Sequence, residues 1–345
     1  MADTIIDPGI IFYCAKSIFP YIGTLKKSAQ SILKRNNIED IHDIRVSSRR
    51  IRSCLAIFNE SLPQKKAKSW QKEIKNITAV YGAVRDLDVQ IDLINTIIQS
   101  AQDPHIRRGL RRIKLRLSQK REKKQQATKQ VTQSILDNAN LLEMEAWASA
   151  ILNNSDLEDY RTSELFRQGY KNIQTRLDEF LFYEVFIFDP ARIEELHQMR
   201  IAAKRLRYAL EIFSDLFDSK IDFAMDIARQ VQQYLGEIHD ADVWITYLPQ
   251  FMEKEQKRVE NFYGYRSPFS RLRPGIDYLL QNRKSERQRL YIDFLNDWKN
   301  WKLKETWLNL RKVIFLTNIE EFQPKALASD DASFPEDHQN PRQEQ

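Results

Sequence analysis

Hydrophobic residues along most of this chain recur three or four positions apart, the spacing that places them on one face of an α-helix. The clearest example is the set Ile41, Ile44, Ser48, Ile51, Leu55 and Phe58. Only 8 glycines and 11 prolines interrupt the 345 residues, and Leu, Ile, Lys, Arg, Gln and Glu all favour helices. The pattern therefore predicts an all-α protein.

The same periodicity predicts several further long elements. We expect helices at about 9–36, 104–137, 157–187, 271–301 and 303–318. Asp189-Pro190 has the form of an N-cap followed by proline at the first helical position, so it predicts the start of another helix. Ser and Asp residues near 153–156 indicate a boundary. The polar, acidic, proline-containing tail 323–345 is expected to be disordered.

Two blocks of sequence occur twice. Residues 41–58 read IHDIRVSSRRIRSCLAIF and residues 196–213 read LHQMRIAAKRLRYALEIF, at an offset of 155. Residues 81–89 read YGAVRDLDV and residues 235–243 read LGEIHDADV, at an offset of 154. A loop absorbs a one-residue difference of this kind. The repeat predicts two copies of one helical unit within a domain at 1–322, one copy at about 9–152 and the other at about 157–320.

Each copy of the first block carries a stripe of cations beside its apolar face. At 100° per residue the stripe lies about 110° from that face and runs for about 15 Å. The stripes consist of His42, Arg45, Arg49 and Arg52 in one copy, and His197, Arg200, Lys204 and Arg207 in the other. Stacked like charges cost free energy, so the shared register points to a bound anion. Arginine suits phosphate oxygens.

Two readings of these cations remain open. The alternative to an anion site is a solvated basic face with intramolecular ion pairs. Arg50 and Arg205 lie off the stripes, where each could serve a neighbouring groove or a carboxylate. No second His, Cys or carboxylate stands at metal-ligand spacing from His42 or His197, so we predict no metal and no cofactor.

The second block contributes paired aspartates, Asp86 with Asp88 and Asp240 with Asp242. Carboxylates two positions apart on a helix do not face each other. We therefore predict that they hold arginines of the stripes in one rotamer, which reduces the side-chain entropy lost on binding. A divalent metal or an acid–base pair is the competing interpretation.

Residues 105–129 form a basic amphipathic segment with eleven Lys or Arg and one Glu. Its counterpart in the second copy is also basic, and part of this charge is expected to extend the site. A helix of this kind also suits a membrane surface. The net charge is +6 overall, with −3 on residues 323–345 and +9 on the rest. The balance implies an anionic partner and leaves open nucleic acid, anionic membrane and phosphate polymers.

The rest of the sequence predicts a cytoplasmic protein. Cys14 and Cys54 are too few for a disulfide framework and are expected to be reduced, buried thiols. The start Met-Ala-Asp lacks the basic region of a signal peptide. No run approaches the roughly 20 apolar residues of a membrane span.

The motifs HDIRVSSRRIR and HQMRIAAKRLRYALEIF, each followed by Gly and then RDLDV or HDADV, resemble the CHAD family, the conserved histidine α-helical domain. The resemblance covers about 9–320. It implies two pseudo-symmetric four-helix bundles packed around a basic central cleft or pore. It also implies binding of inorganic polyphosphate without catalysis. The binding residues it implies are those of the stripes, with Arg116, Lys120, Arg283 and Arg287 from the following helices.

Two features qualify this resemblance. No ExExK strand of a triphosphate-tunnel domain is present, so a standalone module is expected. His239 replaces the arginine expected in the second RDxDV, which predicts a weaker or pH-sensitive second half-site.

Three functions follow for testing. The first is non-catalytic polyphosphate binding, for localisation to polyphosphate granules or for regulation together with polyphosphate-metabolising enzymes. The second is nucleic-acid binding, although the stripes lack interleaved aromatics apart from Tyr208 and no DNA-reading motif is present. The third is an enzyme, which we do not expect because no P-loop, catalytic carboxylate pair or nucleophile–base pair is visible.

Overall fold

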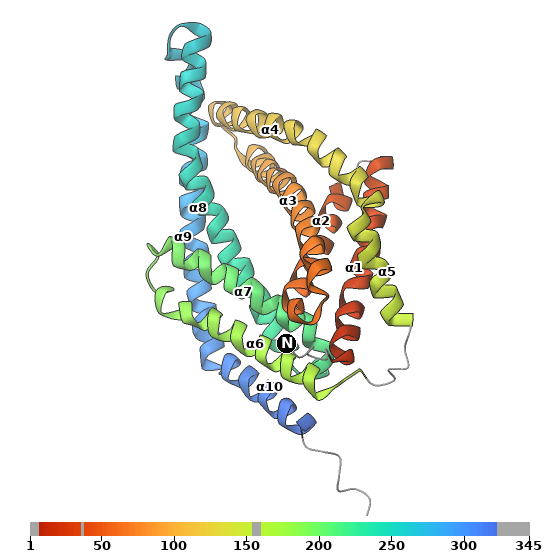
Figure 1. Ribbon diagram of the computed structural model, residues 1–345. Helices are drawn as coiled ribbons and strands as arrows, with labels where there is room; N and C mark the ends of the chain where they lie inside the picture. The colour runs from red at the N-terminus through yellow and green to blue at the C-terminus, as the bar shows by residue number, and fades with distance from the viewer. Residues whose placement is uncertain (1–6, 36–37, 154–159, 323–345) are drawn as a thin grey trace, which may run out of the picture.

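The computed structural model describes residues 7–35, 38–153 and 160–322, and it is built from helices joined by turns (Figure 1). The α-helices of these residues are α1 (Pro8–Arg35), α2 (Ile38–Ile57), α3 (Gln64–Ser100), α4 (Pro104–Asp137), α5 (Ala139–Asn153), α6 (Ser163–Leu181), α7 (Ile193–Phe213), α8 (Asp222–Tyr263), α9 (Arg273–Leu303) and α10 (Thr306–Phe322). Short 3₁₀ turns are η1 (Asn59–Ser61), η2 (Phe182–Phe186), η3 (Ser214–Phe217) and η4 (Ser267–Arg271). The predicted all-α class is confirmed.

The helices repeat in order, with α1–α5 forming a first half and α6–α10 a second half. In each half the second helix carries a His block, and the next two form a long hairpin (Figure 1). A fifth helix then returns to the first, since α5 packs on α1 and α10 packs on α6. The sequence did not indicate α5 as a separate helix. The duplicated four-helix bundles remain a prediction.

Several predicted boundaries need correction. The helix expected at about 157–187 begins at Ser163, where the Thr162 hydroxyl accepts from the backbone N–H of Leu165 at 3.2 Å, and it ends at Leu181. The prediction that Asp189-Pro190 opens α7 is wrong. The Asp189 carboxylate caps a turn by accepting from the N–H of Ala191 at 2.9 Å, and α7 begins only at Ile193. Residues 154–156 of the predicted boundary, and the tail 323–345, lie outside the described residues.

The predicted apolar stripes face the core. Every position is buried in both copies, namely Ile41, Ile44, Ser48, Ile51, Leu55 and Phe58, and Leu196, Met199, Ala203, Leu206, Leu210 and Phe213. One large core includes residues of both His helices. A second, smaller core lies where the ends of the hairpins α3–α4 and α8–α9 meet. The two halves therefore share core at two separate places.

Equivalent residues of the two halves contact each other at both places. The rings of Phe58 and Phe213, which correspond in the repeat, pack edge to face with centroids 5.8 Å apart. At the other place α4 crosses α9 backbone to backbone. A Cβ on Gly109 would lie 2.8 Å from the Cα of Gly275, and a Cβ on Gly275 would lie 2.8 Å from the Cα of Gly109. At both places, residues that correspond in the repeat contact each other.

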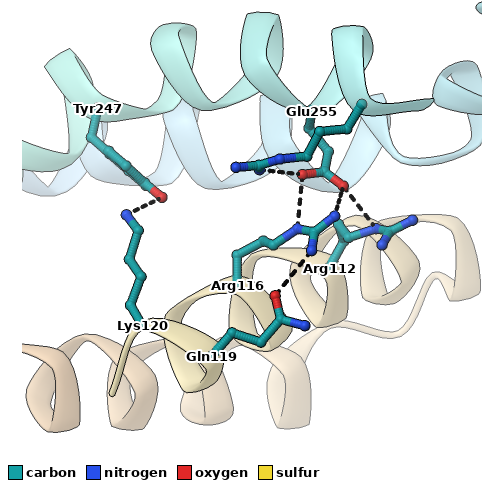
Figure 2. A network of polar contacts seen from close by, with 7 residues as sticks. Arg112, Arg116, Gln119, Lys120, Tyr247 and Glu255 are labelled. Carbon is teal, nitrogen blue, oxygen red and sulfur yellow. Dashed lines mark hydrogen bonds and ion pairs between the residues drawn. The ribbon is translucent and has the colours of Figure 1, made fainter. Parts of the chain in front are cut away.

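A buried carboxylate ties the hairpins together near the smaller core (Figure 2). Glu255 of α8 is fully buried and accepts two hydrogen bonds from Arg116 of α4, at 3.0 and 2.9 Å. Arg112 and Arg258 lie 3.3 and 3.0 Å from the same carboxylate. Burial alone raises the pKa of Glu255, but the hydrogen bonds from Arg116 and Arg258 bring it below its ordinary value. This network joins the two halves through polar contacts.

Candidate polyanion-binding site

The two cationic stripes lie on α2 and α7, and these helices contact each other near their C-terminal ends. The Phe58–Phe213 contact marks that crossing. His42 and His197 stand at the opposite ends of the stripes, near the start of each helix. The stripes therefore approach each other at the ends that carry Arg52 and Arg207, near this crossing.

Lys204 shows how closely the cations of the two halves approach. Its pKa falls from an ordinary 10.5 to about 8, first because burial removes water and then because of Arg200, Arg49, Arg52 and Arg205. Arg49 and Arg52 belong to α2, whereas Lys204 belongs to α7. The structure thus brings arginines of both stripes near one lysine, where they lower its pKa in addition to burial.

The glycine of the second motif lies beside the first arginine of each stripe. A Cβ on Gly82 of α3 would lie 4.0 Å from Nε of Arg45, and one on Gly236 of α8 would lie 3.6 Å from Nε of Arg200. Arg45 donates to the Asp86 carboxylate at 3.2 Å. Nε of Arg200 is buried and has no hydrogen-bond partner in the described part of the chain. A buried donor of this kind favours an anionic partner.

The aspartates of the second motif have three different environments. Asp86 contacts a stripe arginine, as expected. Asp88 instead pairs with Arg121 of α4 at 2.5 Å, and Asp242 pairs with Arg287 of α9. These partners differ from the stripe arginines that the sequence predicted. Asp240 is exposed and makes no ion pair with any other described residue.

Arg121 is a candidate residue that sequence reasoning missed. It corresponds to Arg287 if the hairpin helices are aligned on Gly109 and Gly275, at an offset of 166. Both arginines pair with the second aspartate of their own half. The shared Gly-apolar-x-x-apolar pattern, GLRRI and GIDYL, was the signal that could have identified it.

The cations near the helix crossing are partly neutralised. Nε of Arg49 donates to the hydroxyl of Tyr208 at 2.9 Å, across the boundary between the halves. Arg50 forms an ion pair with Glu211, and Arg207 lies 3.4 Å from the same carboxylate. Arg207 also lies over the Tyr208 ring, 4.8 Å from its centroid. The off-stripe Arg50 therefore serves a carboxylate of the other half.

The remaining predicted cations are dispersed. Arg205 is exposed and lies 3.9 Å from Glu179. Arg116 belongs to the network around the buried Glu255 carboxylate (Figure 2). Lys120 donates to the hydroxyl of Tyr247 at 3.2 Å, reaching from α4 to α8 (Figure 2).

Arg283 and Arg52 are the last two of the cations that the sequence predicted for the site. Arg283 donates to the side chain of the asparagine that precedes it, at 3.0 Å, and burial lowers its pKa. Arg52 is exposed and has no ion-pair partner among the described residues.

The histidines differ between the halves. Nδ1 of His197 lies 3.0 Å from Nδ1 of His239, and their ring centroids are 4.2 Å apart. Burial, followed by Arg200 and His197, lowers the pKa of His239 to about 4, so it is neutral near pH 7. In the first half His42 lies beside Arg85, the counterpart of His239. The first half therefore has one permanent cation more.

The described residues offer little for metal binding, membrane insertion or thiol chemistry. They contain no group of three or more His, Cys, Asp or Glu that could hold a metal ion. None of their helices combines the length and hydropathy needed to cross a bilayer. Cys14 and Cys54 are both buried and free, as expected, and burial raises the pKa of each thiol.

The fold and the site define an all-helical protein with a repeated order of helices, in which cationic faces from two halves approach each other. The family model for the CHAD domain matches residues 19–249, and the chain belongs to the CHAD family. The crystal structure of the CHAD domain from the plant Ricinus communis is similar, with 22% sequence identity, 79% of this chain and 90% of that chain covered, and a TM-score of 0.49. No curated protein matches the chain.

Proposed function

We propose that this protein binds inorganic polyphosphate without catalysis, along the facing stripes of α2 and α7. The observation that carries the proposal is the position of half-buried Lys204 among arginines of both halves, where burial first and then these arginines lower its pKa to about 8. Such clustering is unfavourable without an anion. A chain of phosphates supplies negative charge along the whole stripe, and CHAD proteins are linked to polyphosphate binding in general.

Nucleic acid is the second candidate, and the position of Tyr208 argues against it. Binding to single-stranded nucleic acid commonly uses exposed aromatic rings on which bases stack. Tyr208 is only 6% exposed, and its hydroxyl accepts a hydrogen bond from Arg49. The ring is therefore unavailable to a base, which favours a polymer of bare phosphate.

The test measures affinity for long-chain polyphosphate, RNA and ATP at two salt concentrations. Affinity for polyphosphate should fall steeply with salt, because neutralising many phosphates releases many counterions. The double variant Arg45→Glu with Arg200→Glu should abolish binding while circular dichroism shows a folded protein. The matched control is Lys27→Glu with Lys312→Glu, which changes two exposed cations on α1 and α10 and should bind normally.

Two results would contradict the proposal. One is tight polyphosphate binding by the folded double variant. The other is RNA that polyphosphate cannot displace, which would favour the nucleic-acid candidate. Catalysis is tested by incubation with polyphosphate and Mg²⁺, where we expect no release of phosphate above the buffer control.

The proposal extends to the cell. Polyphosphate binding would place the protein on polyphosphate granules in the cytoplasm, beside the enzymes that make or degrade the polymer. A fluorescently tagged chain should co-localise with granules, and the Arg45→Glu with Arg200→Glu variant should be diffuse. Granule localisation that survives in this variant would indicate recruitment by another protein.

A further inference from the structure

Two grooves occupy corresponding places in the two halves. The lysine groove, about 460 Å³, lies between α3 and α4 and is lined by Ala83, Asp86, Leu87, Gln90, Lys120, Lys123 and Lys124. The acidic groove, about 250 Å³, lies between α8 and α9 and is lined by Gln230, Gln233, Tyr234, Glu237, Arg289, Leu290 and Asp293. Three positions correspond directly, at offsets of 154 and 166: Ala83 with Glu237, Lys123 with Arg289, and Lys124 with Leu290.

The charges of the two grooves are opposite. Lys123 and Lys124 are exposed and have no ion-pair partner among the described residues. In the acidic groove Arg289 is neutralised, because it lies 2.7 Å from Glu286 and 2.9 Å from Asp293. Arg289 is the one cation that lines the acidic groove among the described residues, and Glu237 adds a further negative charge there. An anionic polymer is therefore attracted to one groove only.

The lysine groove also adjoins the proposed binding site. Asp86 lines the groove and contacts Arg45 of the first stripe at 3.2 Å. Lys120, on the α4 wall of the groove, reaches Tyr247 of the second half, with its Nζ 4.7 Å from the ring centroid. Asp86 therefore lines the lysine groove and also contacts the first stripe.

We infer that the lysine groove extends the polyphosphate track on the first half alone, so that a long chain leaves the stripes over α4. The inference rests on the proposed function and names the part of the polymer that this surface takes, the segment beyond the stripes. Lysine suits this task because its ammonium is a compact charge on a flexible side chain, which can donate hydrogen bonds to a phosphate in many orientations. The acidic groove repels the chain, so the site is asymmetric although both halves repeat the same order of helices.

The decisive experiment compares tripolyphosphate with long-chain polyphosphate. In the variant Lys123→Gln with Lys124→Gln, affinity for the long chain should fall about tenfold at low salt. The slope of log affinity against log salt should become shallower by about 1.4, at roughly 0.7 for each phosphate contact of a single strand. Affinity for tripolyphosphate should not change. Lys27→Gln with Lys312→Gln, with the same loss of charge elsewhere, should affect neither ligand.

A second variant tests the same idea by gain. Glu237→Ala with Glu286→Lys gives the acidic groove the residues found at Ala83 and Lys120 of the lysine groove. It should bind long chains more tightly than the wild type and leave tripolyphosphate binding unchanged. Equal losses for both ligands in the lysine variant, or no loss for either, would overturn the inference. Failure of the wild type to bind any polyphosphate would instead overturn the proposed function.

Discussion

Replacing Lys204 by glutamine should stabilise the unliganded protein and weaken polyphosphate binding. Lys204 lies half-buried among arginines of both stripes, and its pKa falls from 10.5 to about 8. Removing a cation that forms a stabilising ion pair would destabilise the protein. Removing the charge of Lys204 instead relieves a repulsion, because burial and four arginines all disfavour the protonated form of this side chain.

The size of the effect follows from that pKa. A fall from 10.5 to about 8 is equivalent to about 3 kcal/mol, at about 1.4 kcal/mol for each pH unit. The side chain keeps contact with solvent, which screens part of this repulsion, so we expect a gain of about 1 to 2 kcal/mol. At roughly 2 cal/mol/K of unfolding entropy per residue, Tm should rise by about 1.5 to 3 °C.

The assay is thermal unfolding of the wild type and Lys204→Gln over a range of pH, with Lys27→Gln as a control for loss of one exposed cation. Below pH 8 both folded and unfolded wild type keep the lysine proton, so the full penalty is present. Between pH 8 and 10.5 only the folded protein releases it, and the stability of the wild type rises towards that of the variant. The difference should vanish above pH 10.5.

The reasoning is refuted if Lys204→Gln is no more stable than Lys27→Gln at pH 7. It is also refuted if the difference between wild type and variant does not shrink at alkaline pH. Polyphosphate titrations on the same samples should show weaker binding by Lys204→Gln and normal binding by Lys27→Gln.

Three further predictions concern the helix crossing, the buried carboxylate and the histidine pair. Gly109→Ala should lose about 2 to 4 kcal/mol in urea unfolding, because its Cβ would meet backbone at 2.2 Å. Gly23→Ala, with no atom within 4 Å of the added Cβ, should raise the free energy of unfolding by about 0.5 to 1 kcal/mol. Equal changes in the two variants would contradict a close backbone crossing at Gly109. Glu255→Gln should lower the free energy of unfolding by about 3 to 5 kcal/mol. Glu253→Gln, which removes an exposed ion pair with Lys257, should change it by no more than about 0.5 kcal/mol in the same assay. His239→Arg should raise polyphosphate affinity at pH 7 by about tenfold to a hundredfold through one added hydrogen bond to a charged group, worth about 1.5 to 3 kcal/mol. Because the pKa of His239 is lowered to about 4, the wild type should lose Tm as pH falls from about 6.5 to 4, and His239→Gln should lose less.

The stripes were predictable because they depend only on spacing within one helix. The positions of Ile51 and Leu55 at helical intervals determine which face is buried, and the place of Arg52 beside that face follows. The start of α7 was mispredicted for a local reason. Asp followed by Pro caps turns as well as helices, and at Asp189 the turn is what forms.

Contacts between the halves could not be read from the sequence. Arg116 meets Glu255 across 139 residues of chain, and no local pattern indicates that pairing. The α8–α9 hairpin is also longer than α3–α4, so the repeat offset grows from 154 at the aspartates to 166 at Gly275. An alignment at a constant offset therefore passes over Arg121.

The paired contacts of Phe58 with Phe213 and of Gly109 with Gly275 have an evolutionary consequence. Residues that meet their own counterparts across a two-fold axis are characteristic of an isologous interface between identical subunits. In a homodimer encoded by one gene, each substitution changes both copies at once. Within one chain the two copies mutate independently, so Ala83 and Lys120 of the first half stand where the second half has Glu237 and Glu286. A repeat within one chain therefore allows the two halves to differ in charge, which identical subunits cannot do.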